Sequence, residues 1–166
     1  MAIIVEDGSI VQNANSYVSR AEYIAHAAAR GVTVADTDAA DPELIQAAAF
    51  IDAHEGNLLG ARFSREQAMS YPRTDLVISG FEWEETEIPR TVKLCQMAIA
   101  LDIRAGVDPF NPQPELLQKR ARVEGAVEVE FFGDDSAARM RRGSLANALL
   151  HDLLRNHGFG FQAVRS

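Results

Sequence analysis

The chain has 166 residues, of which 47% are hydrophobic, and a formal net charge of −8 at pH 7. This length and composition fit one compact domain with a hydrophobic core. The single cysteine, Cys95, excludes an internal disulfide and a cysteine-based zinc site. The acidic balance argues against a surface that grips nucleic acid by neutralising phosphates, because such surfaces usually carry net positive charge.

No apolar stretch approaches the roughly 20 residues that a membrane helix needs. The first residues also lack the positive segment and the long apolar segment of a signal peptide. We therefore expect a soluble protein that is synthesised in the cytoplasm and has no membrane partner.

The first thirty residues predict an extended arm followed by a helix. Residues 1–18 hold short apolar groups separated by an Asp-Gly turn signal. Ser19 and Glu22 then have the spacing of a capping box, in which two side chains satisfy free backbone N–H groups at the helix start. We expect an N-terminal arm over 1–18 and a first helix over 19–30.

A second helix is expected over 42–55. Asp41 is the predicted cap, because Pro42 suits the first helical position. Apolar side chains then recur at helical spacing up to a glycine. A short further helix is expected to begin at Ser64, where Gln67 repeats the capping-box spacing.

The second half of the chain predicts a buried central helix, a strand and a last helix. Residues 71–87 are expected to be a loop with a short extended piece near 76–78. The helix over 87–105 is apolar almost all round, which indicates burial. Apolar and glutamate side chains alternate near 121–132, which predicts a strand or hairpin with one acidic face. A serine cap and a leucine stripe predict a last helix over 144–156.

Together these elements predict a single domain of the mainly α class. A small bundle of four to five helices, with one β-strand or hairpin, forms the core over 19–156. Extended arms are expected at the two ends, over 1–18 and 157–166.

The sequence offers no catalytic constellation. There is no Gly-x-Ser-x-Gly elbow and no phosphate-binding Walker loop. His54 and Glu55 resemble the start of a zinc-protease helix, but the second histidine is missing and position 58 is Leu58. Cys95 lies in the buried helix, which does not suit a nucleophile. We expect no enzymatic activity, no metal and no cofactor.

Two groups of basic residues flank the predicted strand and would approach one another if it turned back on itself. One interpretation is a patch that binds phosphate or docks a protein. The other, which has the greater weight, is a set of ion pairs with the many carboxylates. The residues are Lys119, Arg120, Arg122, Arg139, Arg141 and Arg142.

The C-terminal segment, from about residue 155 to 166, carries aromatic groups and two glycines without helical periodicity. Such a segment suits docking into a partner protein, because burial of its apolar side chains can offset the entropy lost on ordering. A tail folded back on the chain's own core is the alternative. The candidate docking residues are Arg155, His157, Phe159, Phe161 and Val164.

Several stretches match a known phage family. They are Ile3–Gly8 leading to ANSYVS at 14–19, then Tyr71-Pro72-Arg73-Thr74, then Glu87-Ile88-Pro89 before an alanine-rich helix, and the alternating strand at 127–131. With these, the chain resembles the DnaT-like single-stranded-DNA-binding proteins of phages. Its layout is also similar to head–tail connector (adaptor) proteins of tailed phages. Family members often carry Trp where this chain has Tyr71, which keeps an aromatic anchor.

The resemblance implies a structural subunit of the virion neck, in a ring of about twelve copies below the portal. Its partners would be the portal protein, neighbouring adaptor subunits, and a stopper or tail-completion protein. Genomic DNA would pass through without sequence-specific binding. A lumen lined with carboxylates would repel phosphates and keep the DNA path free; the candidate lining residues are Glu124, Glu128 and Glu130.

The alternative function is a single-stranded-DNA-binding accessory protein of replication. Such proteins interleave aromatic stacking platforms with basic residues. Only 7% of this chain is aromatic, and we find no such interleaving in the sequence. We therefore expect the adaptor function, and tight, salt-sensitive retention of single strands would favour the alternative.

Overall fold

The fold is mainly α, as predicted, and the computed structural model describes residues 2–111 and 144–155. The helices of these residues are α1 (Arg20–Ala28), α2 (Asp41–Asp52), α3 (Arg90–Arg104) and α4 (Leu145–Leu153), with 3₁₀ turns at Asp38–Ala40 and Glu55–Asn57. Four two-residue strands, β1 (Ala61–Arg62), β2 (Arg73–Thr74), β3 (Val77–Ile78) and β4 (Phe81–Glu82), pair as two antiparallel ladders, β1–β2 and β3–β4. The strand predicted near 121–132 and the tail over 157–166 lie outside the described residues.

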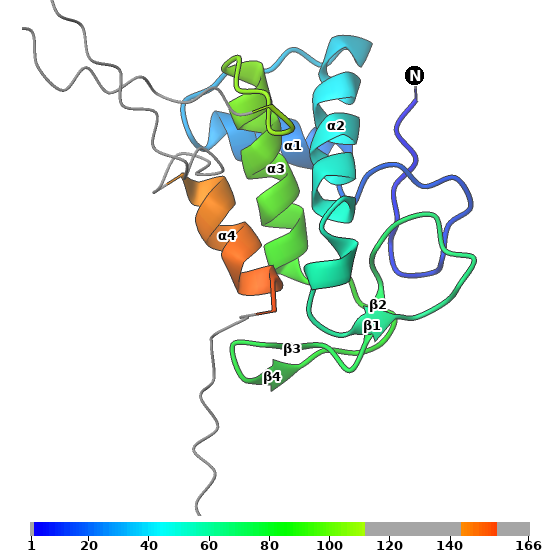
Figure 1. The fold of residues 1–166 in the computed structure, drawn as a ribbon. Helices are drawn as coiled ribbons and strands as arrows, with labels where there is room; N and C mark the ends of the chain where they lie inside the picture. The colour runs from blue at the N-terminus through cyan, green and yellow to red at the C-terminus, as the bar shows by residue number, and fades with distance from the viewer. Residues whose placement is uncertain (1, 112–143, 156–166) are drawn as a thin grey trace, which may run out of the picture.

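The centre of the described fold is a layer of three helices, and α3 is the middle one. It packs against α2 on one side and α4 on the other, while α1 crosses behind them and both β ladders lie beyond one end (Figure 1). The α3 side chains of Val92, Cys95 and Ile99 are buried. The predicted central helix over 87–105 is therefore confirmed, although it begins at Arg90, directly after Pro89. Within the described ranges, no helix has the length and apolar character needed to cross a membrane.

Two helix starts form as their local sequence predicts. In α1 the backbone N–H of Glu22 donates to the Ser19 hydroxyl at 3.3 Å, and the Ser19 N–H donates to the Glu22 carboxylate at 2.7 Å, which completes the capping box. In α4 the N–H of Asn147 donates to the Ser144 hydroxyl at 3.2 Å. These caps need only residues three positions apart, so the sequence alone can predict them.

The predicted cap of α2 is wrong. Asp41 is the first helical residue and makes no capping hydrogen bond. Its buried carboxylate instead accepts from the Arg20 guanidinium, with Nε at 2.8 Å and Nη2 at 2.9 Å. A bidentate ion pair binds a carboxylate more strongly than a single hydrogen bond from a backbone N–H does. The Asp41 side chain therefore pairs with Arg20 on α1 and does not cap α2.

The short helix predicted at Ser64 is also wrong, because residues 64–70 form turns. The Gln67 side chain does accept from the Ser64 N–H at 2.8 Å, as in a capping box. Its amide nitrogen, however, donates to the carbonyls of Met69 at 2.8 Å and Pro72 at 3.1 Å. These two bonds hold the chain in a compact loop, which a helix in this segment could not satisfy.

The segment predicted as a loop over 71–87 contains three of the four strands. The extended piece expected near 76–78 corresponds to β3, and β4 pairs with it in the register Val77 to Glu82 and Ile78 to Phe81. Ser79 and Gly80 connect them with φ of 54° and 83°. Positive φ at both central residues is what a two-residue hairpin turn of the favoured type requires.

The N-terminal segment, predicted as an extended arm over 1–18, has no helix among residues 2–18 and is folded onto the body. Glu6 donates its N–H to the Ser16 carbonyl at 2.8 Å, and Asn15 donates to the Ile4 carbonyl at 2.9 Å. The fully buried Glu6 carboxylate then accepts the N–H groups of Gly8, Ile10 and Val11 at 2.9 to 3.1 Å. These bonds close residues 4–16 into a loop.

Gln96 on α3 joins this N-terminal loop to two helices. Its fully buried side chain donates to the Ser16 hydroxyl at 2.7 Å and to the Leu44 carbonyl of α2 at 2.9 Å. Its oxygen accepts the N–H of Tyr17 at 2.9 Å. One amide thus satisfies three polar groups that would otherwise be buried without partners.

Replacing Gln96 with alanine should lower the free energy of unfolding by about 2–4 kcal/mol, because buried donors and acceptors lose their partner. The exposed Gln12 is the matched control, and Gln12→Ala should change stability by less than about 0.5 kcal/mol. Urea denaturation followed by circular dichroism measures both. Equal effects of the two substitutions would show that Gln96 does not hold these segments together.

Candidate functional site

The N-terminal motif that carries the family resemblance is used for folding. Asn15 accepts the Ile4 N–H at 2.8 Å and donates to the Ala2 carbonyl at 3.1 Å. The Ser16 hydroxyl donates to the Val18 carbonyl at 2.7 Å. Tyr17 and Val18 are fully buried. The motif therefore contributes a loop and core contacts, and it leaves no reactive group on the surface.

Tyr17 connects that motif to the second one, at residues 71–74. Its hydroxyl donates to the Asp52 carboxylate of α2, which also accepts the Ser70 N–H at 3.1 Å. The Tyr71 N–H donates to the Tyr17 oxygen at 3.3 Å, and the two tyrosine rings meet edge to face with centroids 5.9 Å apart. Burial raises the pKa of Asp52, while burial and the nearby Asp52 charge raise the pKa of Tyr17 well above its ordinary value. Tyr17 therefore remains a donor.

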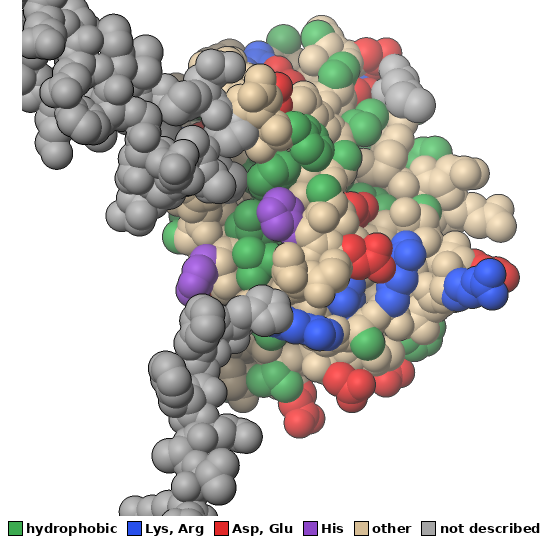
Figure 2. Space-filling view, in the orientation of Figure 1, with side chains coloured by type: hydrophobic (Ala, Val, Ile, Leu, Met, Phe, Trp, Pro, Cys, Tyr) green, Lys and Arg blue, Asp and Glu red, His purple; other side chains and the backbone are tan. Residues whose placement is uncertain are grey.

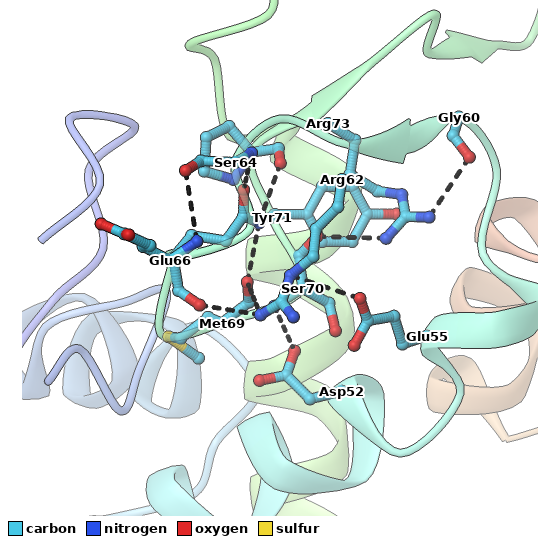
Figure 3. A network of polar contacts seen from close by, with 12 residues as sticks. Asp52, Glu55, Gly60, Arg62, Ser64, Glu66, Met69, Ser70, Tyr71 and Arg73 are labelled. Carbon is cyan, nitrogen blue, oxygen red and sulfur yellow. Dashed lines mark hydrogen bonds and ion pairs between the residues drawn. The ribbon is translucent and has the colours of Figure 1, made fainter. Parts of the chain in front are cut away.

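Arg73 is the charged centre of the second motif. Only 4% of the residue is exposed, and its guanidinium lies 5.8 Å from the centroid of the Tyr71 ring. It donates to the carbonyls of Ser70 and Gly60, each at 3.2 Å (Figure 3). It also donates to the Leu59 carbonyl at 2.7 Å. Burial lowers the pKa of Arg73, because a low-dielectric surrounding disfavours the charged form.

Arg62 and Arg155 complete an arginine cluster with Arg73. Arg62 is the cross-strand partner of Arg73 in the β1–β2 ladder, and its Nη2 donates to the Gln67 carbonyl at 2.8 Å. Arg155, which follows α4, donates from Nη2 to the same Gly60 carbonyl at 2.7 Å. We name these three residues the Gly60 arginine cluster.

One carboxylate accompanies the cluster among the residues that the structure describes. Glu55 lies 3.3 Å from the Arg62 Nε and is itself partly exposed (Figure 3). Figure 2 shows basic side chains (blue) beside acidic ones (red) over the lower part of the visible face. The surface is therefore mixed in charge there, with a local excess of guanidinium groups around Gly60.

Gly60 is required by the cluster's geometry. Its φ of +71° is a conformation that L side chains rarely adopt, and a Cβ there would lie 2.5 Å from the Thr74 carbonyl oxygen. Without a side chain, the loop can approach β2 closely enough for its carbonyl to accept from both Arg73 and Arg155.

The described residues show no arrangement suited to catalysis. Within 2–111 and 144–155, no three His, Cys, Asp or Glu side chains gather in a way that could hold a metal ion. Burial raises the pKa of Cys95 to about 12, so this thiol stays protonated. A cavity of about 340 Å³ lies between the N-terminal loop and α1, but its charged lining residues, Arg20 and Asp38, are paired at 2.6 Å.

Of the functional residues predicted from the sequence, the structure describes only Arg155. Its N–H donates to the Asn57 carbonyl at 2.7 Å and its guanidinium donates to Gly60, so it fastens the end of α4 to the body. The other docking residues, the channel-lining glutamates and the basic patch all lie outside the described residues, and their roles remain predictions.

Sequence reasoning missed the Gly60 arginine cluster. The Pro-Arg-Thr motif is characteristic, but its sequence alone indicates no physical role. Two signals are present, an arginine directly after Tyr-Pro and a glycine at position 60. Neither signal predicts which residues meet, because Arg73 and Arg155 lie 82 positions apart by their residue numbers.

A family model described as "Putative DnaT-like ssDNA binding protein" matches residues 1–166. The chain belongs to this family. The curated proteins and the solved structures gave no match. The DnaT-like family match covers the full length, as the motif resemblance did, and its description names single-stranded DNA as the ligand. It names no head–tail role.

The two substitutions Gly60→Ala and Gly31→Ala should separate backbone strain from steric contact. Both glycines have nearly the same φ, +71° and +73°, but a Cβ at Gly31 would meet nothing within 4 Å. Gly31→Ala should cost about 1–2 kcal/mol for the left-handed conformation alone. Gly60→Ala should cost at least about 1 kcal/mol more, because the loop must move away from β2. Thermal or urea unfolding measures the difference, and equal costs would contradict this geometry.

Proposed function

We propose that this chain is a non-catalytic structural subunit of a tailed-phage particle, a head–tail adaptor that forms a ring through which genomic DNA passes. Its layout, which is similar to head–tail connector proteins, supports the proposal. The DnaT-like family match on its own favours single-stranded-DNA binding, so the adaptor function depends on a physical argument about the surface.

The observation that carries the proposal is the distribution of charge. Exposed carboxylates surround the β3–β4 hairpin and its exit, at Glu82, Glu84, Glu85 and Glu87. Arg73, in contrast, is buried, and Arg62 and Arg155 each donate to carbonyls of their own chain. Across the whole chain, Asp and Glu number 24 against 16 Lys and Arg. Such a surface repels phosphates at long range, as a conduit for DNA requires.

Single-stranded-DNA binding is the second candidate, and the description of the family favours it. Phe81 is 74% exposed and Phe63, directly after Arg62, is 39% exposed. Exposed aromatic rings beside arginine can stack bases. Acidic Glu82 and the nearby Glu84, however, follow Phe81 in the chain, and their charge opposes the approach of a phosphate backbone.

The partners in this proposal are the portal protein, neighbouring copies in a ring of about twelve, and a stopper or tail-completion protein. The segment from Arg155 onward would dock on the portal, and the family resemblance alone motivates the copy number. The virion neck is the proposed location.

Fluorescence anisotropy with a labelled oligothymidine should detect no saturable binding at physiological salt up to roughly 100 μM protein, the weak end of non-specific affinity. The acidic surface is the reason. Phe81→Ala and Phe63→Ala should leave this result unchanged. Tight binding that weakens steeply with salt, and that these substitutions reduce, would support the second candidate and contradict the adaptor proposal.

A further inference from the structure

We propose that the Gly60 arginine cluster binds a single phosphate-type oxyanion, either a free phosphate or one phosphate of a nucleic-acid backbone. The cluster is a local exception to the acidic surface. The inference goes beyond the adaptor function, because one isolated phosphate contact does not retain a DNA strand at physiological salt.

The geometry brings two guanidinium groups to one carbonyl oxygen and places a third arginine opposite one of them in the β1–β2 ladder. Arg73 and Arg155 donate to the same carbonyl oxygen, so their Nη2 atoms, at 3.2 and 2.7 Å from it, lie close to each other. Arg62 is directly opposite Arg73 in an antiparallel ladder, where paired side chains share one face. Like charges directly opposite each other are unfavourable, and a bound anion would relieve this repulsion.

The charge of the cluster is incompletely balanced by the described residues. Glu55 pairs with Arg62, but no carboxylate within residues 2–111 and 144–155 forms an ion pair with Arg73 or Arg155. Only 4% of Arg73 is exposed, and the groups that accept its hydrogen bonds are neutral carbonyls. Burial lowers the pKa of Arg73, electrostatic interactions with Tyr71 and Glu55 partly oppose this shift, and the charge of Arg155 adds to it. A buried cation of this kind gains most from a nearby anion.

Donors remain available at the surface. A guanidinium carries five N–H groups. Arg155 uses one of its side-chain nitrogens, Nη2, for Gly60, and Arg62 makes its described contacts through Nε and Nη2. Both residues are exposed. Their remaining N–H groups can bind the oxygens of a phosphate in the forked geometry that guanidinium favours. The buried Arg73 adds positive charge beneath this surface.

A titration of the full chain with inorganic phosphate, at ionic strength held constant with sodium chloride, tests the proposal. The arginine Nε–H signals in NMR spectra are the readout. We expect saturable shifts at Arg62 and Arg155, and we expect Arg155→Gln to weaken phosphate binding about tenfold, as for the loss of one charge-assisted hydrogen bond. Arg30 is the matched control, because it is exposed and also donates to one carbonyl, that of His26 at 3.2 Å. Arg30→Gln should leave the affinity unchanged.

Arg62→Gln serves as a second variant, and its melting temperature shows whether the fold is retained. The absence of saturable shifts, or equal phosphate affinity in Arg155→Gln and the wild type, would overturn the proposal. A parallel titration with oligothymidine at low salt identifies the source of the phosphate. Shifts at the same arginines with the oligonucleotide would assign a nucleic-acid backbone, and shifts with inorganic phosphate alone would assign a free phosphate.

Discussion

The buried amide of Gln96 is the interaction on which the rest of the structure depends. It joins the N-terminal loop, α2 and α3 through Ser16, Leu44 and Tyr17. Because Tyr17 is held in place, its hydroxyl can reach Asp52, and Asp52 in turn fixes the backbone before Tyr71. A buried polar group without a hydrogen-bond partner lowers stability. Each hydrogen bond in this series therefore favours the one position of the next residue that satisfies its polar groups.

The series continues to the other end of the chain. The Tyr71 ring packs against the Arg73 guanidinium. This guanidinium donates to the carbonyls of Leu59, Gly60 and Ser70. Leu59 also donates its N–H to the Leu153 carbonyl at 2.9 Å, and the Arg155 guanidinium donates to the Gly60 carbonyl. The two motifs that carry the family resemblance are therefore scaffolding. Their residues explain why the segments meet, and Arg73 also contributes its charge to the proposed phosphate site.

The sequence predicted what local chemistry decides. The capping box at Ser19, the hydroxyl cap at Ser144 and the apolar character of α3 depend on residues within a few positions, and all three formed. The predictions failed where a distant partner decides. Arg20 takes the Asp41 carboxylate from its helix end, and Gln67 folds its own segment into turns. Gln96 holds the N-terminal segment on the body. The arginine cluster could not be predicted for the same reason, because Arg155, which follows α4, meets Arg73 only in the folded chain. The predicted strand and tail lie outside the described residues and stay predictions.

We propose that this chain serves in the phage particle and not at a replication fork. Quantitative mass spectrometry of purified virions tests it most directly, with the portal protein as the internal reference. A ring matched to the portal predicts that the chain is present in virions at roughly the copy number of the portal protein. Its absence from purified virions, together with its recovery on single-stranded DNA from infected cells, would contradict the account.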